Sequence, residues 1–190
     1  MIIDLLKKRC SVRAFKDMEI KDSIIEEILE AGRLSPSGGN EQSWKFGVLS
    51  TRERIQQIAE ASYNQNWIKS SPLVIVLCTM IVDDSRGART VQEKRFPRYN
   101  DDINKMDKTL YSYLNMEEHQ TKIAGTHMSL CALEHGIHST WISYFDVEKV
   151  GALLTLPSDL IPSEMLAFGY PQQEPCLTEK KPLSEIVFYS

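Results

Sequence analysis

The chain has 190 residues, which is enough for one domain with a sizeable hydrophobic core. Hydrophobic residues make up 42% of the chain and charged residues 25%, the ordinary composition of a soluble globular protein. The net charge of −4 argues against a nucleic-acid-binding protein, because such proteins usually carry a strongly basic surface.

The sequence carries no pattern for membrane insertion or secretion. Its longest apolar stretch, Leu73 to Val82, is far shorter than the roughly 20 residues of a membrane span. The N-terminal "MIIDLLKKRC" places its charges after its apolar residues, the reverse of a signal peptide. The four cysteines are far apart and include no Cys-x-x-Cys pair, which is typical of reduced thiols. We therefore expect a cytoplasmic protein that does not enter a membrane.

The first elements are two helices separated by an extended segment. A short helix ends in the basic run 7–9, and the segment 9–15 after it is interpreted as extended. A second helix is predicted from about Ser23 to Leu34, because its apolar residues recur every 3.6 positions. Ser23 and Glu26 have the spacing of a capping box at its start.

Two strands are predicted next, with a helix between them. Residues 44–50, "WKFGVLS", form the first strand, and Ser50 with Glu53 is interpreted as the cap of the helix after it. Residues 71–82, "SPLVIVLCTMIV", are almost continuously apolar and β-branched. That pattern indicates a strand buried on both faces.

A polar stretch and a long helix come next. From Asp83 to about Asn115 the chain is charged and weakly periodic, which favours a mobile, lid-like insertion over a second domain. The helix is predicted from about Glu117 to His135. Its apolar residues are expected on the inward side: Ile123, Ala124, Met128, Cys131 and Ala132.

The last part of the chain completes the predicted sheet. Strands are expected at 139–145 and 164–170, with a helix capped by Asp146 between them. The tail 171–190 ends in the apolar "EIVFY". Helices and strands are interleaved without strict βαβ alternation, so the sequence predicts a single domain of the layered α+β class.

The segment "RCSVR" could bind an anion. Alternate residues of an extended segment face the same side, so Arg9, Ser11 and Arg13 would converge. Two guanidinium groups and a hydroxyl suit a phosphate, whose oxygens accept paired hydrogen bonds from arginine. The alternative is a pair of surface arginines in solvent.

The stretch "SPSGGNEQSWKF", residues 35–46, could approach a ligand closely. Gly38 and Gly39 leave their backbone amides unshielded, and Asn40 and Gln42 add polar side chains. The stretch matches neither the dinucleotide fingerprint Gly-x-Gly-x-x-Gly nor the phosphate-binding loop that ends in Gly-Lys-Ser/Thr. The alternative is a glycine-rich turn from helix to strand.

Other chemistry has little support in the sequence. Lys180 and Lys181, taken alone, are interpreted as a solvated charge pair. The histidines have no acidic partner at metal-ligand spacing, so no metal site is predicted. Neither a Gly-x-Ser-x-Gly motif nor a convincing Cys–His pair is present, so nucleophilic catalysis is not expected and no catalytic side chain is named.

Six motifs in order give the chain a family resemblance: "RCSVRAF", "SPSGGNEQSWKF", "SSPLVIVL", "AGTHMSLCALEHGIHSTWI", "FGYP" and "EKKPLSEIVFY". Together they resemble the nitroreductase family of FMN-dependent oxidoreductases over nearly the whole chain. The resemblance implies a central, mostly antiparallel sheet flanked by helices. It also implies a homodimer with a domain-swapped C-terminal tail, 171–190, and a variable insertion, 83–116, near the substrate pocket.

The resemblance also implies cofactor-binding residues. Arg9, Cys10, Ser11 and Arg13 would hold the FMN phosphate and ribityl chain, and Lys180 or Lys181 would complete the phosphate site. The flavin would be touched from the partner subunit by Pro36, Ser37, Gly38, Asn40 and Gln42. Gln65 or Asn66 would contact its pyrimidine edge, and a backbone amide of Ile142, Ser143 or Tyr144 would bond its N5 atom.

The implied activity is transfer of hydride from NAD(P)H to FMN, followed by reduction of a small organic acceptor such as a nitroaromatic or quinone in a ping-pong mechanism. Many relatives carry Glu-Gly where this chain has Ser143-Tyr144, and Tyr144 adds bulk where the ring is expected. Two alternatives therefore stay open. One is a non-enzymatic FMN-binding or flavin-sensing protein; the other is a dehalogenase or flavin-fragmenting enzyme on the same fold.

Overall fold

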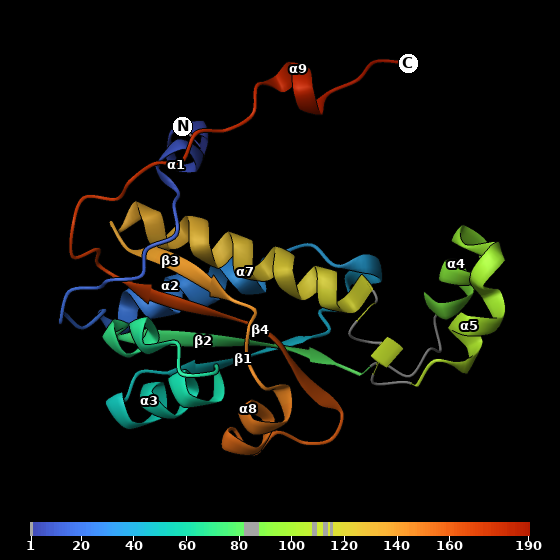
Figure 1. The fold of residues 1–190 in the computed structure, drawn as a ribbon, viewed down its shortest axis with the longest axis horizontal. Coiled ribbons are helices and arrows are strands. Elements are labelled where there is room, and N and C mark those ends of the chain that lie inside the picture. Colours follow the sequence, from blue (N-terminus) through green and yellow to red (C-terminus); the bar gives the residue numbers. More distant parts are fainter. Residues whose placement is uncertain (1, 82–87, 108–109, 112–113, 115) are drawn as a thin grey trace.

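The computed structural model describes residues 2–81, 88–107, 110–111, 114 and 116–190. In this part of the chain one antiparallel sheet has the strand order β1-β2-β4-β3, drawn edge to edge in Figure 1. The strands are β1 (Trp44–Leu49), β2 (Leu73–Met80), β3 (His138–Ile142) and β4 (Leu160–Gly169). The predicted antiparallel α+β fold is confirmed.

Helices cover both faces of the sheet (Figure 1). One face packs against α2 (Asp22–Arg33) and α7 (Met116–Glu134), the other against α3 (Arg52–Ala61) and α8 (Val147–Leu153). The described part of the chain also contains α1 (Ile2–Lys8), α4 (Ala88–Arg95), α5 (Asn100–Lys105) and α9 (Leu183–Ile186), with 3-10 turns at Gly38–Asn40, Asn66–Ser70 and Pro97–Tyr99.

Strand β2 is the centre of the core. Val74 and Val76 pack with the α3 and α8 layer, whereas Ile75 and Leu77 pack with the α2 and α7 layer. The prediction of a strand buried on both faces is confirmed, because opposite faces of a strand carry alternate residues. The strand begins two residues later than predicted, and Val82 lies outside the described residues.

Two of the predicted helix caps are wrong. Helix α2 already includes Ser23, and its N-cap position, Lys21, makes no side-chain capping bond. Helix α3 is capped by Thr51, whose hydroxyl accepts a hydrogen bond from the amide of Arg54, and not by Ser50. The cap predicted for α8 is confirmed, since the Asp146 carboxylate accepts from the Lys149 amide at 3.1 Å.

Helix α7 buries Ala124, Met128 and Ala132 as predicted, but Ile123 is 40% exposed and Cys131 only half-buried. The close approach of Gly125 to the sheet sets the rotation of the helix, because a Cβ there would lie 2.5 Å from Leu77 Cδ1. Ile123 lies about 200° around the helix from that contact and therefore faces outward.

The third and fourth strands differ in extent from the predictions. Strand β3 ends at Ile142, so the predicted residues up to Phe145 form a loop. Strand β4 begins at Leu160, four residues before the predicted start at Glu164. It contains Pro162, a residue that usually argues against a central strand; the pairing register with β2 shifts next to this position.

The described part of the predicted insertion, 83–116, contains α4 and α5, which the weak periodicity did not indicate. They lie to one side of the sheet in Figure 1. Arg89 on α4 connects this helix to α5 and to Tyr111: its guanidinium lies 4.2 Å from the ring centroid of Tyr111 and donates a hydrogen bond to the Ile103 carbonyl. These contacts are non-local, so they leave no period in the sequence.

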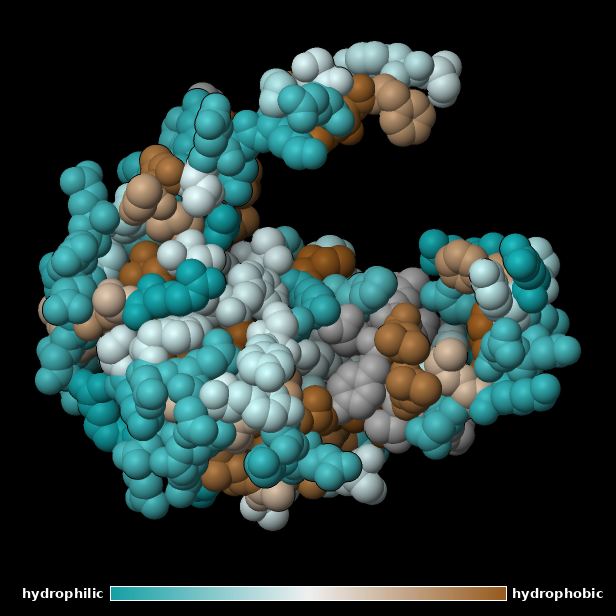
Figure 2. Space-filling view, in the orientation of Figure 1, coloured by the Kyte–Doolittle hydropathy of each residue, from teal (hydrophilic) through white to brown (hydrophobic). Residues whose placement is uncertain are grey.

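The tail beyond Pro171 runs past α1 and ends away from the sheet (Figure 1). Its apolar side chains form an exposed arm, visible above the body in Figure 2. Phe188 is 87% and Tyr189 95% exposed, and Leu183 and Ile186 on α9 are also exposed. Exposed apolar surface of this extent is typical of an interaction site.

Candidate functional site

The N-terminal segment lies beside the start of β3. Ser11 forms a parallel bridge with Ser139, and the Thr140 hydroxyl donates a hydrogen bond to the Val12 carbonyl. Cys10 is 4% exposed, whereas Ser11 and Arg13 are exposed. Ser11 and Arg13 thus lie outside the core, whereas Arg9 is half-buried, and the convergence of all three side chains stays a prediction.

Beneath this segment is a buried thiol–imidazole contact. Cys10 Sγ lies 3.9 Å from His138 Nδ1. Burial lowers the pKa of His138 and the charge of Arg9 lowers it further, although a hydrogen bond to the Cys10 backbone acts in the opposite direction. Burial also raises the pKa of the Cys10 thiol. The imidazole and the thiol are therefore both favoured in their neutral forms.

A row of contacts joins Arg13 to the end of β3. The Arg13 guanidinium lies 5.8 Å from the centroid of the Trp67 ring, and Trp67 Nε1 donates to Gln65 Oε1 at 3.4 Å. The Gln65 amide then donates to the carbonyls of Tyr144, at 2.7 Å, and Ser62, at 3.1 Å. Both ends of the Gln65 amide are engaged, whereas Asn66 is exposed.

Tyr144 ends this row, just after β3. Its side chain is 67% exposed, and its ring centroid lies 4.4 Å from that of Tyr63. Within the described part of the chain, the Tyr144 amide donates to no backbone carbonyl. Tyr63 and Asn64 have φ values of 54° and 59°, a left-handed conformation that is uncommon for residues other than glycine. The segment that presents Tyr63 is therefore sharply turned.

The loop 36–42 lies before β1, against α7. The Gly38 amide donates to the side chain of Gln120, and the Gln42 amide donates to Ser37 Oγ at 3.0 Å. Gly39, Asn40 and Gln42 have φ values of 57°, 56° and 52°. Positive φ fits glycine and asparagine well, and here it gives a tight, outward-facing loop.

In one chain the loop 36–42 is remote from Arg13. Strands β1 and β3 are the opposite edges of the sheet. Across the sheet, three strand spacings separate β1 from β3 by about 14 Å. Along the strands the separation is about 16 Å, the length of β1, because the loop precedes Trp44 whereas Ser11 is level with the other end of β1. The structure thus brings together the residues near β3 but not those of the loop.

The tail passes beside the N-terminal segment before it reaches Lys180 and Lys181. The Lys16 amide donates to the Tyr170 carbonyl at 2.8 Å, and the Gln172 amide donates to the Ala14 carbonyl at 2.9 Å. Both lysines are exposed. Among the described residues Arg9, Arg13, Lys180 and Lys181 form no ion pair with a carboxylate.

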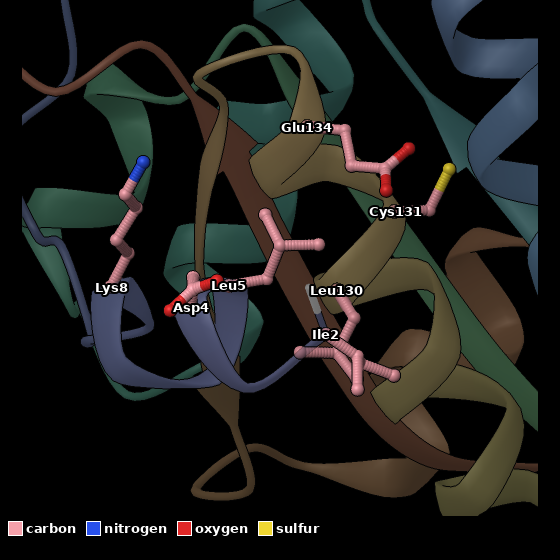
Figure 3. A pocket seen from close by; sticks show the side chains of 7 residues that line it. All are labelled: Ile2, Asp4, Leu5, Lys8, Leu130, Cys131 and Glu134. Carbon is pink, nitrogen blue, oxygen red and sulfur yellow. The ribbon is translucent and has the colours of Figure 1, made fainter.

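Two hollows on the surface lie away from these residues. A groove of about 660 Å³ between α1 and α7, shown in Figure 3, is lined by Ile2, Asp4, Leu5, Lys8, Leu130, Cys131 and Glu134. A pocket of about 300 Å³ lies among α4, α5 and the start of α7. Neither is lined by a residue that the sequence analysis assigned to the cofactor.

The described residues bring no three potential metal ligands of the His, Cys, Asp or Glu type together. None of the helices in the described ranges has the length and apolar character needed to cross a bilayer. Sequence reasoning missed three residues that organise the site: Trp67, Tyr63 and His138. Only Trp67 had a usable signal, because it is an aromatic residue next to the predicted pair 65–66.

The fold and the site define a class of layered α+β protein with an arginine-bearing segment at one sheet edge and a glycine loop at the other. A family model described as the Nitroreductase family matches residues 6–170. The chain therefore belongs to the nitroreductase family, which makes it a nitroreductase-type oxidoreductase.

Named relatives agree with this membership. An oxygen-insensitive NADPH nitroreductase of Helicobacter acinonychis is 30% identical, covering 80% of this chain and 78% of that protein. A Thermus thermophilus NADH dehydrogenase is 26% identical, covering 96% and 92%. The solved structure of an FMN-dependent nitroreductase from Clostridium difficile superposes with a TM-score of 0.74 at 20% identity, covering 99% of each chain.

Proposed function

We propose that this protein is a homodimeric, FMN-dependent oxidoreductase that takes hydride from NAD(P)H and reduces a small organic acceptor, such as a nitroaromatic or quinone, by a ping-pong mechanism. The observation that carries the proposal is the unbroken row of contacts from Arg13 through Trp67 and Gln65 to Tyr144. One end of this row is the Arg13 guanidinium, and the other is Tyr144, whose backbone amide donates to no described backbone carbonyl.

The cations of the site fit a phosphate. Arg9 and Arg13 have no described carboxylate partner, and neither has Lys180 or Lys181 in the tail. A phosphomonoester carries up to about two negative charges, which such groups bind through charge-assisted hydrogen bonds. These residues would hold the phosphate of FMN, with Ser11 and the Cys10 backbone beside the ribityl chain.

The end of β3 fits a flavin ring. Bound FMN would supply the hydride chemistry, so the protein's own residues have to bind the cofactor, orient it and enclose its ring. The Tyr144 amide would donate to N5, and the exposed Asn66 would face the pyrimidine edge. The Tyr63–Tyr144 pair would flank the ring and favour flat acceptors, which stack well on aromatic side chains.

A second copy of the chain would complete the site. The loop 36–42 is too far from Arg13 to reach the same ligand within one chain, so its contact with the flavin requires a partner. The exposed arm of the tail, including Phe188 and Tyr189, supports a swapped attachment to that partner. The segment 83–116 would lie near the substrate pocket, and the enzyme would act in the cytoplasm.

The absorbance spectrum of the purified protein tests the proposal. We expect a yellow protein, or one that becomes yellow with added FMN, whose visible absorbance bleaches when NADH or NADPH is added without oxygen. The colour should return on addition of a quinone or nitroaromatic. A ping-pong mechanism predicts parallel double-reciprocal plots. A colourless preparation that binds no added FMN would refute the assignment.

A non-enzymatic FMN-binding protein is the second candidate. The large exposed Tyr144, next to the proposed N5 position, favours it, because its ring could cover the face that a nicotinamide must approach. In that case the yellow protein would not bleach with either reduced nicotinamide. Replacement of Tyr144 by Gly would then restore bleaching.

A further inference from the structure

The loop 36–42 is attached to α7 at two points. The Gly38 amide donates to Gln120 Oε1, and the hydroxyl oxygen of Ser35, just before the loop, lies 2.7 Å from His127 Nδ1. Ser35 and Gln120 are each 5% exposed. Loss of either contact would therefore leave a polar group that water can hardly reach, which costs more free energy than the loss of an exposed hydrogen bond.

The two attachment points have matching spacings. Gln120 and His127 are seven residues apart, which is about two turns and about 10.5 Å along the axis of α7. Ser35 and Gly38 are three residues apart, and three extended residues span about 10 Å. Ser37 is extended, with φ of −141° and ψ of 154°, and a residue before a proline, such as Ser35, also favours an extended conformation. The segment between the two points therefore runs extended along α7.

Beyond this segment the chain makes a tight turn. Gly39, Asn40 and Gln42 have positive φ values, which for residues other than glycine persist only where the surroundings impose them. The Gln42 amide donates to Ser37 Oγ at 3.0 Å, and the Gln42 side chain donates to the Asn40 carbonyl at 3.3 Å. These bonds close the turn on itself, whereas Gln120 attaches it to the body of the protein.

The attachment decides which groups of the loop can bind a ligand. The Gly38 amide, expected from the sequence to be unshielded, is occupied by Gln120. The side chain of Asn40 is exposed and forms no hydrogen bond with the residues that the structure describes. The loop therefore presents the Asn40 side chain outward, while the backbone before it is held against α7.

We propose that Gln120 is a positioning residue, which acts through the Gly38 amide to hold the loop 36–42 in the conformation that presents Asn40 to the flavin of the partner subunit. This role rests on the proposed function, because the loop is expected to reach FMN only across the dimer. Gln120 itself would touch neither the cofactor nor the acceptor. Loss of its acceptor oxygen should weaken FMN binding by about two- to tenfold, the effect of one neutral hydrogen bond.

Two substitutions of Gln120 separate its acceptor oxygen from its bulk. Gln120→Met has a similar length and no acceptor, whereas Gln120→Glu keeps an oxygen that can accept from the Gly38 amide. Hydrogen exchange of the Gly38 amide, followed by NMR on 15N-labelled protein, measures the attachment without any flavin. Titration of FMN fluorescence measures the cofactor affinity. In Gln120→Met we expect about two- to tenfold faster exchange and an FMN affinity lower by a similar factor. Gln120→Glu should restore both.

The variant Thr79→Val is the matched control. Thr79 is 1% exposed and its hydroxyl lies 2.8 Å from that of Thr121 on α7 and 2.6 Å from that of Ser163. The substitution therefore removes buried hydrogen bonds next to the same turn of α7 and leaves the loop 36–42 untouched. It should lower the free energy of unfolding while the exchange of Gly38 and the FMN affinity stay at the parent values.

Several results would overturn the proposal. One is a Gly38 amide that exchanges in the parent as an unprotected amide does, an observation that needs no variant to fold. The others are equal exchange in Gln120→Met and the parent, faster exchange with unchanged FMN affinity, or an equal loss of affinity in Thr79→Val. A parent that binds no FMN would refute the proposed function and with it the cofactor role of Gln120; Gly38 protection that Gln120→Met removes would still establish the attachment.

Discussion

Arg13 combines two features in one side chain: its guanidinium lies over the Trp67 ring, and it has no carboxylate partner among the described residues. We expect Arg13→Ala to weaken FMN binding by about ten- to a hundred-fold, because a hydrogen bond to a charged group contributes about 1.5–3 kcal/mol. Titration of FMN fluorescence against protein measures the change. Arg98→Ala removes the same charge from the exposed turn before α5 and should leave FMN affinity unchanged. Equal binding by Arg13→Ala and parent would refute the phosphate role.

His138 gives the folded state a dependence on pH. Burial and Arg9 lower its pKa below the ordinary value of about 6.5 that it has in the unfolded chain. The unfolded chain therefore binds the proton more readily, and the stabilising contribution of the neutral imidazole is fully present above about pH 6.5 and is lost as the pH falls toward the lowered pKa. Urea unfolding at several pH values should show stability declining below about pH 6.5.

The variant His138→Gln isolates this effect. Its stability should decline less steeply over the same interval, whatever its absolute value, and the exposed His119→Gln serves as the comparison. If the slopes of His138→Gln and the parent agree, the buried imidazole is not the source of the pH dependence.

At the scale of elements, strong local patterns predicted best. Strand β2 was predicted because a continuous apolar, β-branched run depends on burial alone; the extent of helix α7 was also predicted, but two of its expected inward residues, Ile123 and Cys131, are not buried. The caps at Ser23 and Ser50 failed because the residue at which the backbone enters a helix depends on the preceding turn. The N-cap position lies two residues before Ser23, at Lys21, and one residue after Ser50, at Thr51. The helices in the insertion, 83–116, were not predicted because Arg89 on α4 contacts Ile103 and Tyr111, which are distant in sequence.

Two glycines in helices should respond oppositely to alanine. In α7 a Cβ at Gly125 would lie 2.5 Å from Leu77 Cδ1 and 2.7 Å from the Trp141 ring, so Gly125→Ala should cost about 1–3 kcal/mol of unfolding free energy. In α8 nothing lies within 4 Å of a Cβ at Gly151, and Gly151→Ala should add about 0.5–1 kcal/mol. Urea unfolding measures both. A similar change in the two variants would contradict the close packing of α7.

For the whole molecule, the tail is expected to hold two chains together. Removal of residues 183–190 deletes α9 and the exposed Phe188 and Tyr189. The shortened chain should sediment as a monomer at micromolar concentration and should lose FMN, since no partner then supplies the loop 36–42. The double variant Lys180→Ala, Lys181→Ala should remain dimeric and bind FMN more weakly. A truncated chain that sediments like the parent would rule out the swapped tail.

The sequence could assign roles to separate segments but could not place them relative to one another. The spacing of Ser11 and Arg13 is local, so their shared exposure was predictable. The row from Arg13 to Tyr144 depends on Trp67 and Gln65, and it forms only when the turn after α3 meets the end of β3. The remoteness of the loop 36–42 results from strand order, which no local pattern encodes.

The placement of the arginine segment and the glycine loop at opposite edges of the sheet has a genetic consequence. If each site takes Arg13 from one chain and Asn40 from the other, Arg13→Ala and Asn40→Gly damage the same site from different subunits; glycine also accepts the φ of 56° at position 40. Hybrid dimers of the two variants would then contain one doubly damaged site and one wholly normal site. Co-expression of the two weakened alleles should give more activity than either allele gives alone.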